Sequence, residues 1–382
     1  MGPKTPSGRV GGLDTLRALA IVLVLVAHYP KPEAGVLTRM LNFGWTGVDL
    51  FFVLSGYLIG GQWFSALARG QSVSLGAFYV RRFLRTLPNY YVVLGIYALL
   101  PVWTAGAAPA PPWKFAGFWQ NFGVPATFSP SWSLCVEEHF YLLFPVVALA
   151  LVRVNRPALA TGVLAGILTL GVTLRTGIWL TVRPDLLAGE QALATYMGSL
   201  YFPTYCRLDG ITLGVGLAAL KNFHPAGWQR LLARGNQLLG ASLVVLAAAV
   251  LAFWQRYSFL CSTVGFSLIS LSFALLAAWA LSERSWLGRA RVPGAKYVAL
   301  LSYAIYLTHS LALECAAWVG SRLDVALLSL TGVALTAVLI ALFSHSLYYA
   351  VERPCLALRD RLFRAGKGEG WKGQPLAVSE AS

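Results

Sequence analysis

The chain has 382 residues, of which 57% are apolar and 12% are charged. A water-soluble globular protein carries about 25% charged residues, so this composition excludes the soluble classes. The formal net charge is +15, but the basic residues lie in short loops between apolar runs. We therefore interpret this charge as a membrane-topology signal and expect no nucleic-acid partner.

Apolar runs long enough to cross about 30 Å of hydrocarbon as helices recur along the whole chain. They predict an all-α fold, a polytopic membrane helix bundle of about ten transmembrane helices. The predicted spans cover residues 13–30, 45–63, 88–104, 132–152, 157–181, 204–220, 237–254, 261–281, 297–319 and 325–350.

Arginine and lysine gather in every second loop, and the other loops are poor in them. By the positive-inside rule, these basic loops and both termini are cytoplasmic. We predict a multi-pass protein of the cell (plasma or inner) membrane, with membrane lipid as a partner and an unknown oligomeric state. Its predicted parts are a cytoplasmic N-terminal segment (1–11), a transmembrane domain (12–354) and a cytoplasmic C-terminal tail (355–382).

Arg17 and His28 stand out in the first span. They are eleven residues apart, close to three helical turns, so they share one helix face about 16 Å apart. An ionisable side chain buried in a span is costly and is a functional candidate. The alternatives are a snorkelling cation for Arg17 and a hydrogen-bonded helix contact for His28.

Glu137 and Glu138 lie in the outer third of the fourth span, at the predicted depth of His28. Carboxylates there are costly to bury unless they are paired, protonated or exposed to a water-filled cavity. Because the two side chains point in different directions, we expect at most one of them to reach His28.

Residues 74–88 are predicted to form a short amphipathic segment along the cytoplasmic interface before Pro88. Arg82 and Arg85 are three residues apart and share one face of it if it is helical. Guanidinium groups placed in this way bind phosphate oxygens through paired hydrogen bonds. A positive-inside anchor is the alternative.

Other polar residues in or near the spans are candidates for binding a substrate. Asp49 opens the second span, although it could equally be a helix-start residue. The others are Arg207, Asp209 and His309. The five cysteines are scattered without CxxC spacing, so we expect no disulfide framework and no metal site.

Taken together and in order, these motifs resemble the acyltransferase-3 family of integral membrane O-acyltransferases. The resemblance runs from about residue 11 to residue 354. It is carried by the Arg-x10-His of the first span, VDLFFVLSGYLI, FYVRRFLRTLP, SWSLCVEEHFYLLFP, YCRLDGITLGVGLA, YAIYLTH and the closing ERP.

The resemblance implies transfer of an acyl group, often acetyl, from cytoplasmic acyl-CoA to a hydroxyl of a glycan or glycoside. It also implies that His28 acts in catalysis and that Arg17, Arg82 and Arg85 act in donor binding. Our hypothesis is that His28 is a general base oriented by Glu138 or Glu137, with an acyl-histidine intermediate as the alternative.

The acceptor is the least defined part of this prediction. A surface polysaccharide is the first expectation, and a small glycosylated metabolite such as a macrolide is the second. A transporter of a small solute or an acylated glycan is an alternative of another class, because ionisable residues within spans also line transport paths.

Overall fold

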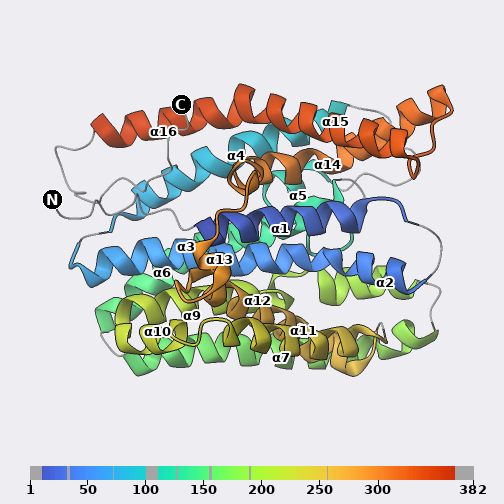
Figure 1. The fold of residues 1–382 in the computed structure, drawn as a ribbon. Helices are drawn as coiled ribbons and strands as arrows, with labels where there is room; N and C mark the ends of the chain where they lie inside the picture. The colour runs from blue at the N-terminus through green and yellow to red at the C-terminus, as the bar shows by residue number, and fades with distance from the viewer. Residues whose placement is uncertain are drawn as a thin grey trace.

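The computed structural model describes residues 11–31, 35–71, 73–99, 111–125, 128–154, 157–188, 191–255 and 257–365. All regular elements among these residues are helices, and the long ones lie side by side with similar axes (Figure 1). In chain order they are α1 (Gly11–His28), α2 (Val36–Asn42), η1 (Phe43–Thr46), α3 (Gly47–Ala68), α4 (Leu75–Leu99), α5 (Pro112–Ala116), η3 (Ser129–Ser131), α6 (Trp132–Val154), α7 (Pro157–Ala188), α8 (Ala192–Tyr196), η4 (Met197–Tyr201), η5 (Thr204–Cys206), α9 (Asp209–Phe223), α10 (Pro225–Leu232), α11 (Gln237–Phe253), η6 (Cys261–Gly265), α12 (Phe266–Leu281), α13 (Trp286–Arg289), α14 (Ala295–Leu323), α15 (Leu330–Leu347), η7 (Tyr348–Glu352) and α16 (Arg353–Ala365).

Seven helical segments of the described chain are long and apolar enough to cross a membrane, which defines a multi-pass membrane protein. An eighth is added if α10 and α11, which meet at an 82° bend, form one span. The seven are Gly11–His28, Val36–Ala68, Ser129–Val154, Ala158–Leu186, Cys261–Leu281, Ala295–Leu323 and Leu330–Phe363.

The remaining predicted spans are also helical, but each falls short of a simple apolar span for a clear reason. Helix α4 carries three arginines in its first half, which lowers its hydropathy. Helix α9 has 15 residues and α11 has 17, against the roughly 20 that cross a bilayer without help.

The amphipathic segment predicted at 74–88 is not a separate element. Helix α4 runs without interruption from Leu75 to Leu99, with Pro88 inside it. Proline normally breaks or kinks a helix because it lacks an N–H, but packing holds this one together: Phe78 is buried before the proline and Tyr90 after it. Arg82 and Arg85 of this helix line a cavity inside the bundle.

Helices α3 and α9 approach each other closely through glycine. A Cβ placed on Gly56 would lie 2.1 Å from the carbonyl oxygen of Ile211, and one on Gly214 would lie 2.1 Å from that of Val53. Small residues let membrane helices approach until their backbones touch. Helix α1 packs against α3 and α14, and its Leu16 is buried.

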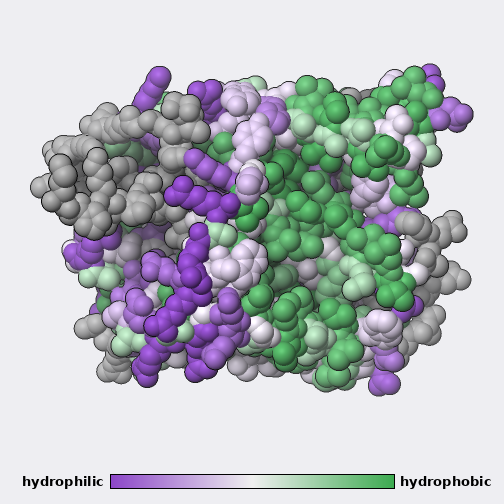
Figure 2. Space-filling model, viewed as in Figure 1, coloured by the Kyte–Doolittle hydropathy of each residue, from purple (hydrophilic) through white to green (hydrophobic). Residues whose placement is uncertain are grey.

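Hydrophilic side chains gather at one end of the bundle, around α10 and α13, while hydrophobic side chains cover its middle (Figure 2). The exposed arginines at this end include Arg230, Arg234, Arg284 and Arg289. We call it the basic end. Helix α1 begins there, and His28, its last residue, lies toward the other end (Figure 1).

Candidate functional site

A cavity of about 100 Å³ lies inside the bundle, between α1, α3, α4, α6 and α14. Its wall includes Arg17, Arg82 and Arg85, the three residues predicted to bind an acyl donor. They come from two helices that are far apart in the sequence. Glu137 is the acidic residue that shares this wall, so the charge around the cavity is predominantly positive.

A chain of hydrogen bonds crosses one side of the cavity. The Tyr141 hydroxyl lies 3.0 Å from Glu137 Oε2 and donates to it, and the Ser55 hydroxyl lies 2.8 Å from the same tyrosine oxygen. The Arg82 guanidinium stacks 4.7 Å above the Tyr141 ring. Glu137, Tyr141 and Arg82 therefore hold one another in place, and the arginine is positioned by both a ring and a carboxylate.

Glu138 points to another side of α6. It lies close enough to Thr86 and Arg82 to interact electrostatically with both. Glu137 and Glu138 therefore both interact electrostatically with Arg82, and they do so from different sides of α6.

His28 is paired with His309. Their ring centroids lie 4.7 Å apart in an edge-to-face arrangement. His28 Nδ1 lies 2.9 Å from the Val24 carbonyl oxygen, and His309 Nδ1 lies 2.7 Å from that of Tyr306. Because a carbonyl only accepts hydrogen bonds, both Nδ1 atoms carry the proton, and Nε2 is the basic nitrogen of each ring.

Two expectations about His28 are not met. It was expected to be buried, but its side chain is exposed because it is the last residue of α1. Glu137 or Glu138 was expected to orient it, but its hydrogen bond goes to Val24 and its neighbouring ring is His309. The fully buried histidine of the pair is His309.

Tyr306 connects the cavity with the histidine pair. It lines the cavity, and its ring centroid lies 5.7 Å from that of His309. Its hydroxyl donates to the Pro130 carbonyl oxygen over 2.8 Å and receives a hydrogen bond from Ser133 over 2.6 Å. The cavity therefore has arginines along its wall and the histidine pair just beyond this tyrosine.

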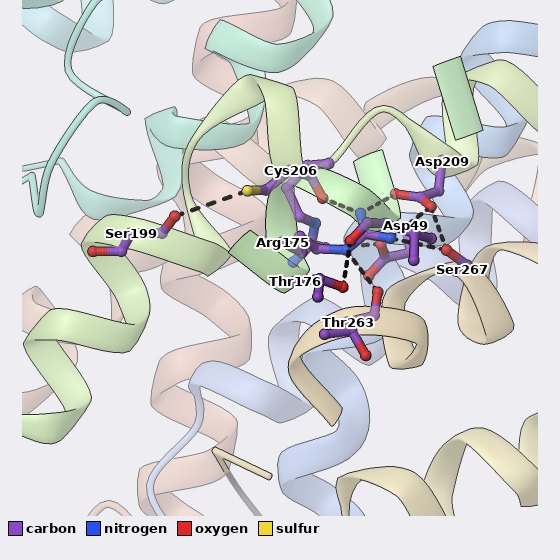
Figure 3. Close-up of polar contacts among 10 residues, drawn as sticks. Asp49, Arg175, Thr176, Ser199, Cys206, Asp209, Thr263 and Ser267 are labelled. Carbon is purple, nitrogen blue, oxygen red and sulfur yellow. Dashed lines mark hydrogen bonds and ion pairs between the residues drawn. The ribbon is translucent and has the colours of Figure 1, made fainter. Parts of the chain in front are cut away.

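The other predicted substrate-binding residues form two ion pairs deep between helices (Figure 3). Arg207 Nη2 lies 2.7 Å from Asp49 Oδ1, and Arg175 contacts both oxygens of Asp209 at 2.7 and 3.1 Å. All four side chains are at most 4% exposed. They do not line the cavity described above, and in this arrangement none offers a surface to a ligand, so the pairs bind helices to one another.

Arg175 was missed by the sequence analysis. An arginine in the middle of an apolar run marks a buried charge that needs a partner, and this pattern could have identified it. Asn89 was missed too, and Glu352 was noted only as part of the closing ERP motif. The Asn89 amide donates to Glu352 Oε2 over 3.0 Å in a buried contact, and Glu352 attracts Arg85 and Arg17. The carboxylate of Glu352, the first residue of the ERP motif, thus offsets part of the positive charge of the arginines that line the cavity.

Within the described part of the chain, no group of three or more His, Cys, Asp or Glu residues is arranged to hold a metal ion. The polar groups of the site are arginines, histidines, glutamates and hydroxyls. This set suits an anionic ligand and proton transfer.

Comparison with known proteins identifies the class. The acyltransferase domain family model matches residues 10–349, so the chain belongs to this family and is a membrane acyltransferase. It is 26% identical over 327 residues to the peptidoglycan O-acetyltransferase of Listeria monocytogenes, a match that covers 78% of this chain and 49% of that protein.

Two further relatives give the same picture. A putative peptidoglycan O-acetyltransferase of Bacillus subtilis is 26% identical over 330 residues, with 78% of this chain and 48% of the relative covered. A putative O-acetyltransferase of Staphylococcus aureus is 25% identical over 324 residues, with 78% and 50% covered. The chain spans about half the length of these curated relatives. No solved structure matches it significantly.

Proposed function

We propose that this protein transfers an acyl group, acetyl in the first instance, from acyl-CoA to a hydroxyl of a carbohydrate. The observation that carries the proposal is an arginine-lined cavity whose lining residue Tyr306 packs against His309 of the histidine pair. The peptidoglycan named for two of the relatives supports a surface polysaccharide as the acceptor.

The donor binds through its phosphates. Arg17, Arg82 and Arg85 present planar guanidinium groups, which hold phosphate oxygens in pairs. Arg17 and His28 are about 16 Å apart along α1 by helix rise, a distance on the scale of the pantetheine arm. A donor anchored at the arginines thus brings its thioester toward the histidines, past Tyr306.

His28 is the general base of the proposed reaction. Its Nε2 removes the proton from the acceptor hydroxyl as that oxygen attacks the thioester carbon. The C–S bond then breaks, and the CoA thiolate leaves with the proton returned by the imidazolium. The new C–O bond completes the ester, so the histidine ends the cycle unchanged.

His309, Glu137 and Glu138 have positioning roles in this scheme. The His309 ring holds the His28 ring edge-to-face, and its own Nδ1 is fixed to the Tyr306 carbonyl. The glutamates act on the donor side, where Glu137 and Tyr141 orient Arg82.

We also propose that α4, α9 and α11 cross the membrane, which with the seven apolar segments gives ten crossings. The positive-inside rule then supports a cytoplasmic basic end, with both termini on that side. Cytoplasmic acyl-CoA reaches the arginines from this end, and His28 lies near the opposite face.

Replacing His28 with alanine tests the proposed chemistry. Loss of a general base lowers the rate by roughly 10²–10⁴-fold, so we expect acetyl transfer from labelled acetyl-CoA to cell-wall glycan to fall by that factor. The matched control is His224→Ala, because His224 is exposed in the segment between α9 and α10. Full transfer by a His28→Ala protein present at normal level in the membrane would refute the role.

A further inference from the structure

A second hollow lies on the outside of the bundle, between α1, α14 and α15. It is a groove of about 280 Å³, lined mainly by Leu25, Leu301, Ile305 and Ile340, with Ala337 and Ala341 as its small residues. Its polar lining, Tyr297, Ser344 and His345, comes from the first turn of α14 and the last turn of α15, the end of the groove nearest the basic end.

The other end of the groove points to the histidine pair. Leu25 is three residues before His28 on α1, and Ile305 is four residues before His309 on α14. Residues three or four apart share a helix face. The apolar groove therefore ends one helical turn from both rings.

The groove and the arginine cavity use different faces of α14. The groove is lined by Leu301 and Ile305, and the cavity by Ser302, Tyr303 and Tyr306. Two separate hollows, one polar and one apolar, thus approach the same pair of histidines from either side of one helix. This arrangement has room for two chemically different substrates.

The apolar lining of the groove and its position on the outside of the bundle suit a hydrocarbon chain as its ligand. The flanking residues Val22, Val338 and Leu342 are exposed at 47%, 63% and 54%, so in a bilayer the groove opens sideways onto lipid. From Tyr297 to Ile305 the groove is about 12 Å long by helix rise. An apolar cavity of about 150 Å³ holds benzene, so this volume has room for roughly ten carbon atoms.

We propose that this groove binds the hydrocarbon tail of a lipid-linked acceptor, whose headgroup then presents its hydroxyl to the exposed His28. The proposal rests on the proposed function and extends it to the class of acceptor. The acyl chain of the donor is the less suitable occupant, because the donor approaches on the cavity side of α14 and the groove opens to the membrane. A tail lying beneath His28 keeps its headgroup at the end of α1.

Photolabelling tests tail binding without needing turnover. The probe is decyl N-acetylglucosaminide with a diazirine at the end of the chain, added to the full protein in phosphatidylcholine vesicles. We expect labelled peptides from α14 and α15, and competition by unlabelled decyl glycoside but not by methyl glycoside. Uniform labelling of the membrane-facing helices, without competition, would mean ordinary lipid contact and overturn the proposal.

Filling the groove supplies the matched variants. Ala337→Phe and Ala341→Phe occupy the hollow, whereas Val338→Phe and Leu342→Phe add the same ring to neighbouring exposed positions of α15. We expect about a tenfold loss of labelling and about a tenfold rise in KM for the decyl glycoside in the first pair. The KM for the methyl glycoside and for acetyl-CoA stays unchanged, and the second pair behaves as wild type.

Two other results would be decisive. A filled groove that changes the preference for donor chain length, and leaves the decyl glycoside unaffected, would assign the groove to the donor and contradict the proposal. Groove-specific labelling without transfer to either glycoside would support tail binding and count against the proposed function instead. The two failures are therefore distinguishable.

Discussion

Arg82 is held more firmly than a basic anchor at a membrane surface requires. Its guanidinium lies over the Tyr141 ring and within electrostatic reach of two glutamates. A cation inside a bundle is costly, and here its surroundings keep it aimed at a cavity. This is the environment expected for a residue that binds an anionic donor.

Replacing Arg82 with alanine should weaken the donor complex. Hydrogen bonds to a charged group contribute about 1.5–3 kcal/mol, so we expect KM for acetyl-CoA to rise roughly 10–100-fold. Arg69→Ala, at the exposed end of α3, serves as the control and should leave KM unchanged. Steady-state kinetics in proteoliposomes measures both. A fall in kcat at unchanged KM would count against a donor-binding role.

The sequence could name most of these residues but not their partners. The sequence indicates how deep a residue lies along a helix, and depth alone matched Glu138 or Glu137 with His28. The packing of α1 against α14 decides instead that His28 meets His309, 281 positions further along the chain. Rotation of one helix about its axis relative to another is not visible in hydropathy, and this is why the glutamate partner was wrong.

At the scale of elements, the α3–α9 contact should be sensitive to a single methyl group. The Cβ of Gly214→Ala would lie 2.1 Å from the Val53 carbonyl oxygen, whereas nothing lies within 4 Å of a Cβ on Gly216. Overpacking of this kind costs about 1–3 kcal/mol. We expect thermal unfolding in detergent to shift downward for Gly214→Ala relative to Gly216→Ala. Equal midpoints would mean that the helices separate freely.

The buried pair of Arg175 and Asp209 provides a second test at this scale. Removing one partner leaves an uncompensated charge, so Arg175→Leu and Asp209→Leu should each destabilise the protein by about 3–5 kcal/mol. The double variant should cost clearly less than the two single variants together. A double-mutant cycle on unfolding in detergent measures this coupling, and simple additivity would show that the pair does not hold α7 to α9.

Helix positions were predictable because long apolar runs favour helices, and each of the ten predicted spans overlaps a helix among the described residues. Residues 100–104 of the third predicted span lie outside that described part. The full length of helix α4 was not predictable in this way. Pro88 predicted a break, but contacts on both sides of it keep the helix continuous. The missing N–H of Pro88 favours a helix end at this residue, but tertiary packing outweighs this local preference.

For the whole molecule, the distribution of charge is the main guide to direction. Exposed arginines gather at the basic end, and apolar side chains cover the middle of the bundle (Figure 2). Loop charge could be read directly from the sequence. The internal cavity and the outer groove could not, because each is built by helices distant in the chain.

The central claim is that a donor enters at the basic end and its acyl group is handed over at His28. The direct test uses membrane vesicles of both orientations from cells that contain the protein, with labelled acetyl-CoA added outside. We predict transfer to glycan in everted vesicles, none in right-side-out vesicles until detergent opens them, and none in either for His28→Ala. Equal transfer by intact right-side-out vesicles would contradict the account.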